Sequence, residues 1–182
     1  MTEYNKKIQD WKQLEGGLKY TWLVDYLTYS AFGTFELSPE DWEKRDLIAN
    51  FKGNSELTTE IDHQQAVDKA IAIATQFIKD TFGDEAKDLT LVCVPAKKEC
   101  NTQHRFERFS QEVCAQTGME NAYGRITEDF VKGKDVVIFD DIIASGGSIS
   151  KFAAHIKTLG ANIICAIALG KTISNGYDQG KD

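Results

Sequence analysis

The stretch VVIFDDIIASGGS, residues 136–148, decides the fold that we expect for this chain of 182 residues. Four apolar residues lead into two aspartates, Asp140 and Asp141, and two isoleucines then precede the small residues 144–148. A short continuous apolar run is typical of a strand buried on both faces. The pattern SISKFAAHIKTLG then predicts a helix over residues 148–159, so we expect a strand, a turn and a helix.

The chemistry of this stretch indicates a ligand that carries both hydroxyls and a phosphate. Carboxylates at the carboxyl end of a strand lie where open α/β sheets bind ligands. A turn of small residues that opens a helix lets backbone N–H groups close on a phosphate, and the helix dipole assists. Together they favour a ribose phosphate. The alternative is a buried strand that ends in two solvated aspartates and a glycine turn.

The same stretch differs from two common nucleotide-binding motifs. A Walker loop would need GxxxxGK[ST], and the Rossmann fingerprint GxGxxG is absent. The thirteen residues instead resemble, position for position, the phosphoribosyl pyrophosphate (PRPP) signature of the type I phosphoribosyltransferases. That signature is a hydrophobic strand, an acidic pair, two hydrophobic residues and a small-small-Gly-x-Ser/Thr turn.

The remaining patterns predict an α/β fold with an open, mainly parallel sheet and helices on both faces, because strands and helices alternate from residue 62 onward. This agrees with the fold of the type I family, which adds a small hood. The predicted strands are 89–95, 121–126, 136–140 and 162–169, and the predicted helices are 62–83, 104–117 and 148–159. We expect residues 1–61 to form an amino-terminal extension and hood segment packed on the core of residues 62–182, within one compact domain.

The amino-terminal extension has its own local signals. Residues 1–18 are a polar segment, and we expect Trp11 and Leu14 to attach it to the rest of the protein. The aromatic and β-branched residues of 19–37 predict two strands around a turn at Gly33. A helix is expected from the N-cap Ser38 to Gly53.

Composition limits the function classes. A net charge of −7 and a pI near 5.0 argue against general nucleic-acid binding. A local basic groove stays open, because Lys97, Lys98, Arg105 and Arg108 are close in sequence. The charged amino terminus lacks an apolar signal core, and no apolar run reaches the ~20 residues that span a bilayer. We therefore expect a soluble, cytoplasmic protein without a membrane partner.

The cysteines and histidines predict no metal site. No CxxC pair exists, and the cysteines in apolar runs are expected to be reduced core residues. The residues concerned are Cys93, Cys100, Cys114 and Cys165, with His63, His104 and His155 scattered among them.

A second site is expected in the loop after strand 89–95, because strands of a parallel sheet end at one edge. The family resemblance makes this the pyrophosphate loop, with Ala96, Lys97 and Lys98 as the candidates. Two ammonium groups and backbone amides suit a pyrophosphate. The alternative is a solvated lysine pair on a surface loop.

The following segment, NTQHRFERFSQ, most resembles the ComF-like branch of the family, whose corresponding segment reads Arg-Gly-Phe-Asn-Gln. Residues 109–111 take the Phe-Asn-Gln positions, but Arg108 occupies the glycine position and Glu107 the arginine position. The catalytic arginine is therefore either Arg105 or Arg108 from a displaced position, or these residues are the solvated face of a helix. The zinc module of that branch is absent from residues 1–61.

The resemblance implies displacement of pyrophosphate from the ribose anomeric carbon by a nitrogen nucleophile. Asp140 and Asp141 would hold the 2′ and 3′ hydroxyls. Ala144, Ser145, Gly146, Gly147 and Ser148 would bind the 5′-phosphate. Mg²⁺ would be held mainly by PRPP and water near the two aspartates, with no direct protein ligand expected.

The acceptor base is not identified by the sequence. Trp22, Tyr26, Tyr29 and Phe32 are candidates to stack on a base, although aromatic residues in strands more often belong to the core. The tail after Gly170 is the other hood candidate, and Lys171 stands alone there. No purine or pyrimidine is favoured, and a homodimer is left open.

Three function classes remain. The first is a Mg²⁺-dependent phosphoribosyltransferase that uses PRPP. The second is a PRPP- or nucleotide-binding regulator of the same fold, which the altered residues 105–111 favour. The third is a phosphatase-like or kinase-like enzyme with Asp140 as nucleophile, which lacks the expected DxDx[TV] motif and a Walker lysine.

Overall fold

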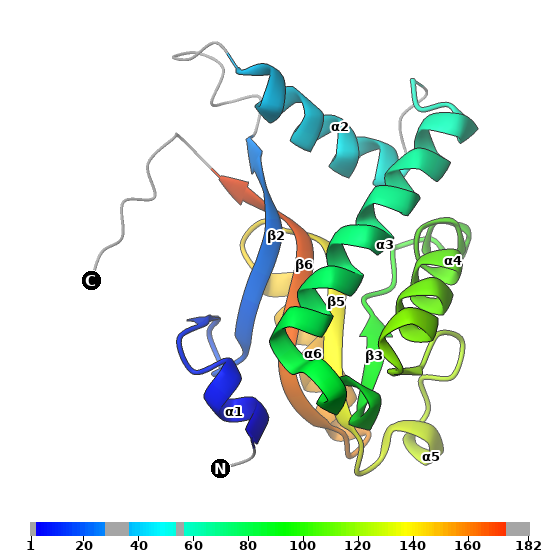
Figure 1. The fold of residues 1–182 in the computed structure, drawn as a ribbon. Coiled ribbons are helices and arrows are strands. Elements are labelled where there is room, and N and C mark those ends of the chain that lie inside the picture. Colours follow the sequence, from blue (N-terminus) through cyan, green and yellow to red (C-terminus); the bar gives the residue numbers. More distant parts are fainter. Residues whose placement is uncertain (1–2, 28–36, 54–56, 174–182) are drawn as a thin grey trace.

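The computed structural model describes residues 3–27, 37–53 and 57–173. Within these residues lies a six-stranded sheet in the order β1-β2-β6-β5-β3-β4, parallel throughout except between β1 and β2. The strands are β1 (Lys12–Gln13), β2 (Lys19–Leu27), β3 (Leu89–Cys93), β4 (Glu120–Asn121), β5 (Asp135–Ile143) and β6 (Asn162–Ile173). The predicted open, mainly parallel sheet is confirmed (Figure 1).

Helices cover both faces of the sheet, as predicted. One face packs against α1 (Glu3–Lys7), α2 (Pro39–Lys52), α3 (Glu60–Phe82), the 3₁₀ helix η2 (Gly83–Asp88) and α4 (Glu99–Thr117). The other face packs against α5 (Glu128–Val131) and α6 (Gly147–Thr158). In Figure 1, α3 and α4 lie in front of the sheet, and α2 crosses its upper end.

The central strand β5 explains this two-sided cover. Val137 and Phe139 belong to the core under α3 and α4, whereas Val136 and Ile138 belong to the core under α6. All four are fully buried. Alternate residues of a strand point to opposite faces, so a continuous apolar run needs helices on both sides.

Two element boundaries differ from the predicted ones in ways that matter for the site. α4 begins at Glu99, five residues before the predicted start. The prediction missed this first turn because it is polar and carries no hydrophobic period. β5 continues to Ile143 instead of ending at residue 140, so both aspartates lie inside the strand. The predicted helix after Ser38 is confirmed, with a capping box between Ser38 and Asp41.

The amino-terminal extension contributes to the same sheet as the core. β2 pairs with β6 in parallel from Tyr20 to Leu27. The predicted turn at Gly33, and Tyr29 and Phe32, lie outside the described residues. The division at residue 61 stays a prediction. Among the helices described, none combines the length and apolar character needed to span a membrane.

Candidate active site

The carboxyl ends of β3 and β5 open into a cavity of about 870 Å³. Its lining comes from the end of α2 (Lys52 and Gly53), the loop after β3 (residues 94–98), α4 (Asn101 and Arg105) and the end of β5 with the turn into α6 (residues 140–149). This is the edge where parallel sheets bind ligands. The structure therefore brings three predicted groups to one cavity: the acidic pair, the turn of residues 144–148, and residues 96–98, which we call the lysine loop.

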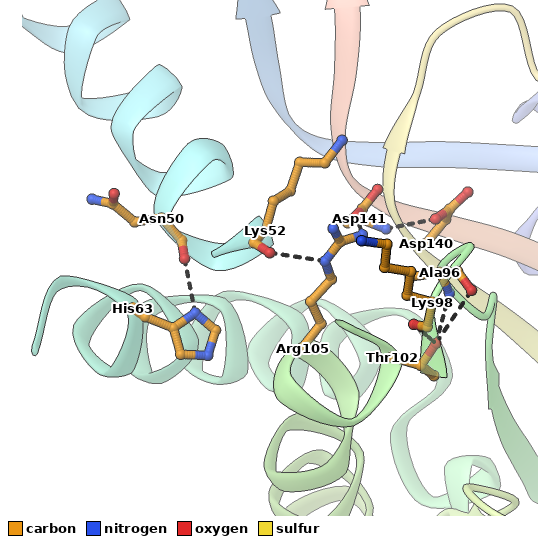
Figure 2. Close-up of polar contacts among 9 residues, drawn as sticks. All are labelled: Asn50, Lys52, His63, Ala96, Lys98, Thr102, Arg105, Asp140 and Asp141. Carbon is orange, nitrogen blue, oxygen red and sulfur yellow. Dashed lines mark hydrogen bonds and ion pairs between the residues drawn. The ribbon is translucent and has the colours of Figure 1, made fainter. Parts of the chain in front are cut away.

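The two aspartates of the acidic pair are held differently (Figure 2). Arg105 Nη1 donates to Asp141 Oδ2 at 2.6 Å, and both side chains are buried. The backbone N–H of Asp141 donates to Asp140 Oδ1 at 2.8 Å. Asp141 is therefore paired with a guanidinium, whereas Asp140 is held by a backbone group.

This difference changes the acidity of Asp140. Burial, and next the charge of Asp141, raises the pKa of Asp140 from 3.8 to about 7. The backbone N–H of Asp141 and the charges of Lys52 and Arg105 act in the opposite direction. A carboxyl group that changes charge near neutral pH, inside a cavity, is typical of a functional site.

Residues 144–148, which we call the glycine turn, connect β5 to α6. Gly146 has φ +84°, a left-handed conformation that glycine adopts without steric cost. No side chain caps the first N–H groups of α6, and Ser145, Gly147 and Ser148 are exposed. Free N–H groups at a helix start favour an anion, so the glycine turn can hold a phosphate.

Two residues far away in sequence hold the glycine turn in place. A Cβ atom on Gly146 would lie 2.6 Å from Leu14 Cδ2, so the leucine packs directly on the glycine backbone. Lys171 Nζ donates to the carbonyl of Ala144 at 3.0 Å. The expected attachment of Leu14 to the body is confirmed, and its place over the turn is new.

The loop after β3 is held by Thr102, a residue that no sequence pattern indicated. The N–H of Ala96 donates to Thr102 Oγ1 at 2.8 Å, and the hydroxyl lies 3.4 Å from the carbonyl of Lys98 (Figure 2). Thr102 is in the first turns of α4. Because Lys97 and Lys98 are exposed and line the cavity, the loop presents two ammonium groups to it.

Lys52 and Asn101 also line the cavity and were not predicted as site residues. The Lys52 carbonyl accepts a hydrogen bond from Arg105 Nε at 3.0 Å. One local signal was the position of Lys52 at the end of a predicted helix, which helix-dipole stabilisation explains equally well. Spatial proximity to Arg105 could not be inferred from that pattern.

Some predicted site residues lie outside the cavity lining. Arg108 forms an ion pair with Asp68 and donates to Gln64 at 2.8 Å on the exposed surface of α4 and α3. Trp22 donates to Asp25 at 2.7 Å, and Tyr26 packs under the guanidinium of Arg45. Within the described residues, these two aromatic side chains are not among the residues around the cavity.

The four cysteines are free, as expected. Cys93, Cys114 and Cys165 are buried, and Cys100 is exposed. Burial raises the pKa of the Cys114 thiol to about 12, which keeps this thiol protonated. The buried cysteines therefore act as small core residues.

Comparison with known proteins adds a family match. Residues 107–181 match the family model described as phosphoribosyl transferase domain. This segment is less than half of the chain, and it contains Asp140, Asp141 and the glycine turn. No curated protein matches the chain.

Two solved structures are similar to parts of the fold. Hypoxanthine-guanine phosphoribosyltransferase from Schistosoma mansoni in complex with IMP is 19% identical with a TM-score of 0.38, over 62% of this chain and 65% of that one. This chain thus spans just under two thirds of that protein. Purine phosphoribosyltransferase from Pyrococcus horikoshii Ot3 is 15% identical with a TM-score of 0.36, over 64% of this chain and 92% of that one. Of these comparisons, the domain match over residues 107–181 is the one that supports the predicted phosphoribosyltransferase activity.

Proposed function

We propose that this protein transfers the phosphoribosyl group of PRPP to a nitrogenous acceptor, a nucleobase or a related compound, and releases pyrophosphate. The observation that carries the proposal is the cavity of about 870 Å³, which is lined at once by a buried acidic pair, the glycine turn and the lysine loop. The domain match over residues 107–181 supports the same activity. A cavity of this size suits a sugar phosphate with a base beside it.

Each part of the cavity has chemistry that fits one part of PRPP. The carboxylates of Asp140 and Asp141 accept hydrogen bonds from the 2′ and 3′ hydroxyls. The N–H groups and hydroxyls of the glycine turn bind the 5′-phosphate. Residues 96–98 and Arg105 bind the pyrophosphate by charge and by backbone N–H groups.

These roles are sufficient for the reaction. The bond from the anomeric carbon to the pyrophosphate oxygen breaks, and positive charge develops on the ribose ring. The acceptor nitrogen forms the new bond to that carbon, and its proton passes to the released pyrophosphate or to water. The nearby carboxylates favour that charge. Binding of the remote 5′-phosphate fixes the ribose, so its binding energy orients the reacting carbon. No protein nucleophile is required.

The donor set fits Mg²⁺ held mainly through substrate and water. Within the described residues, no group of three His, Cys, Asp or Glu side chains is placed to hold a metal. Asp140 and Asp141 supply hard oxygen atoms, and Mg²⁺ keeps several waters when few protein ligands are present. When bound, the ion would neutralise charge on the pyrophosphate.

Several finer assignments belong to the same proposal. The branch is the ComF-like one, on the strength of the residues around 109–111. The acceptor base would enter beside the ribose, and Tyr29 and Phe32 stay candidates for stacking on it. Homodimer formation and a cytoplasmic location stay predictions.

A second function is favoured by one observation. Arg105 is paired with Asp141, so the one arginine lining the cavity among the described residues is engaged with the predicted ribose site. A protein that keeps this pair on binding would retain PRPP without releasing pyrophosphate. That protein would be a PRPP-binding regulator.

One experiment separates the two functions. Pyrophosphate release from PRPP is measured with Mg²⁺ against a panel of nucleobases, beside a calorimetric titration of PRPP alone. Release that depends on one base establishes the transferase and names its acceptor. Binding without release for any base supports the regulator, and absence of PRPP binding refutes both.

A further inference from the structure

We propose that Lys52, at the end of α2, is a substrate-binding residue whose ammonium group binds the diphosphate part of PRPP. The inference rests on the proposed function and extends it to a residue outside the family match of residues 107–181. It follows from three features of the end of α2: its fixed backbone, the direction of the lysine side chain and the absence of a partner for its charge among the described residues.

The backbone around Lys52 is fixed by side chains from two other helices. Arg105 Nε donates to the Lys52 carbonyl at 3.0 Å, and a ring nitrogen of buried His63 lies 2.8 Å from the Asn50 carbonyl. Gly53 ends α2 with φ +60°, and a Cβ there would lie 2.6 Å from His104 Nε2. These contacts hold the last turn of α2 against α3 and α4, so the position of Lys52 is set in advance of binding.

The side chain of Lys52 extends from this fixed point toward the acidic pair (Figure 2). It lines the cavity and is half-buried. Its charge lies close enough to Asp140 to lower the pKa of that carboxyl, against the larger effect of burial. In contrast, Lys44 on the same helix pairs with Glu40 at 2.7 Å.

The ammonium of Lys52 has no hydrogen bond or ion pair with any residue that the structure describes. A half-buried cation that lines a cavity without a protein partner retains its full capacity for an anion. Because the backbone is already fixed, ligand binding has to order only the side chain of Lys52.

The diphosphate, and not the 5′-phosphate, is the part that Lys52 fits. The glycine turn is built from small residues and backbone N–H groups, which suit a single phosphate. The side-chain cations that line the cavity, Lys97, Lys98 and Arg105, belong to the loop after β3 and to α4, and Lys52 is bonded through its carbonyl to Arg105. Lys52 therefore completes what we call the cationic group: Lys52, Lys97, Lys98 and Arg105.

The test compares Lys52→Met with Lys52→Arg and with the matched control Lys44→Met, by calorimetric titration with Mg²⁺ and three probes: PRPP, inorganic pyrophosphate and ribose 5-phosphate. We expect Lys52→Met to bind PRPP and pyrophosphate about tenfold or more weakly and ribose 5-phosphate within about twofold of the parent. Lys52→Arg should retain most of the affinity, and Lys44→Met all of it.

Unchanged affinity of Lys52→Met for pyrophosphate would overturn the assignment, and so would an equal loss for ribose 5-phosphate. Thermal unfolding of each variant separates a lost contact from a lost fold. If the parent binds pyrophosphate but not PRPP, the proposed transfer function fails while the pyrophosphate titration still tests Lys52. If the parent binds neither, both proposals fail.

Discussion

The two regions of the cavity that we propose as anion sites are built in opposite ways. The glycine turn is five consecutive residues, held by Leu14 from outside, and it offers backbone N–H groups to a ligand. The cationic group has members on α2, the loop after β3 and α4, and it offers side-chain charges. Every member of the cationic group also lies outside residues 107–181, whereas the glycine turn and the acidic pair lie inside. If the proposed function holds, the matched segment contains the groups for the ribose 5-phosphate part of PRPP, and the groups for its diphosphate lie outside that segment.

The largest effect is expected from a substitution in the glycine turn. Gly146→Val places side-chain atoms against Leu14 and requires a β-branched residue at φ +84°. We expect ribose 5-phosphate affinity to fall by about a hundredfold or more, since the N–H groups of the turn can no longer keep their arrangement. Titration with ribose 5-phosphate measures this loss.

A matched control exists for the backbone strain. Gly124 has φ +71°, with no atom within 4 Å of an added Cβ, and it is not among the residues around the cavity. Gly124→Val should lose stability of the order of 1–2 kcal/mol and keep its affinity for ribose 5-phosphate. Normal titration by Gly146→Val would contradict the phosphate role of the turn.

The next largest effect is a difference in stability between substitutions of Asp140 and of Asp141. Asp141→Asn leaves the buried guanidinium of Arg105 without its charge partner, so we expect a loss of about 3 kcal/mol in the free energy of unfolding. Asp140→Asn removes a carboxylate that burial disfavours, so it should stabilise the protein at pH 8 by about 1–3 kcal/mol. Urea denaturation of both variants measures the contrast. Equal effects on stability would refute the unequal environments.

The same contrast explains which parts of the site could be predicted. The strand, acidic pair and glycine turn are local, because an apolar run buried on both faces and a left-handed glycine leave their pattern in consecutive residues. The sheet followed from the alternation of such patterns. The parallel pairing of β2 with β6 did not, because aromatic and β-branched residues in 19–37 indicate strands but not their neighbours.

The cationic group was only partly predictable for a physical reason. Lys97 and Lys98 follow a predicted strand directly, so the rule for strand ends placed them. Lys52 reaches the cavity because His63 and Arg105 hold the end of α2, and these contacts join residues 13 and 53 positions apart. The choice between Arg105 and Arg108 depended on which face of α4 turns inward. The polar first turn of that helix carries no signal for it.

A smaller effect tests that choice between the two arginines. Arg105→Gln should lower turnover by about tenfold to a hundredfold, since Arg105 is buried and lines the cavity. Arg108→Gln should leave turnover unchanged and cost at most about 1 kcal/mol of stability, because its ion pair with Asp68 is exposed. Steady-state kinetics at saturating PRPP, with unfolding curves for both variants, provides the measurement. Equal turnover in Arg105→Gln and the parent would return Arg105 to a structural role.

The smallest expected effect is a pH dependence that originates at Asp140. Burial and the charge of Asp141 raise its pKa to about 7, so its carboxylate forms mainly above neutral pH. We expect PRPP affinity in Mg²⁺ to rise by up to about tenfold between pH 6 and 8, as this carboxylate becomes available to the ribose hydroxyls. The phosphate groups of the ligand also titrate near pH 6. The pH dependence of affinity that remains in Asp140→Asn is therefore the part due to the ligand.

The stability of the protein should change in the opposite direction. Between pH 4 and 7 the folded state keeps the proton on Asp140, whereas the unfolded chain, with a pKa of 3.8, releases it. The folded state then binds more protons, so the contribution of Asp140 to the free energy of unfolding is fully present below about pH 4 and is lost as pH rises through 7. Binding and stability are thus opposed at one carboxyl group, and Asp140→Asn should flatten both profiles. If neither the PRPP affinity nor the stability of the parent protein depended on pH in this way, the Asp140 carboxyl would be exposed to water and not buried.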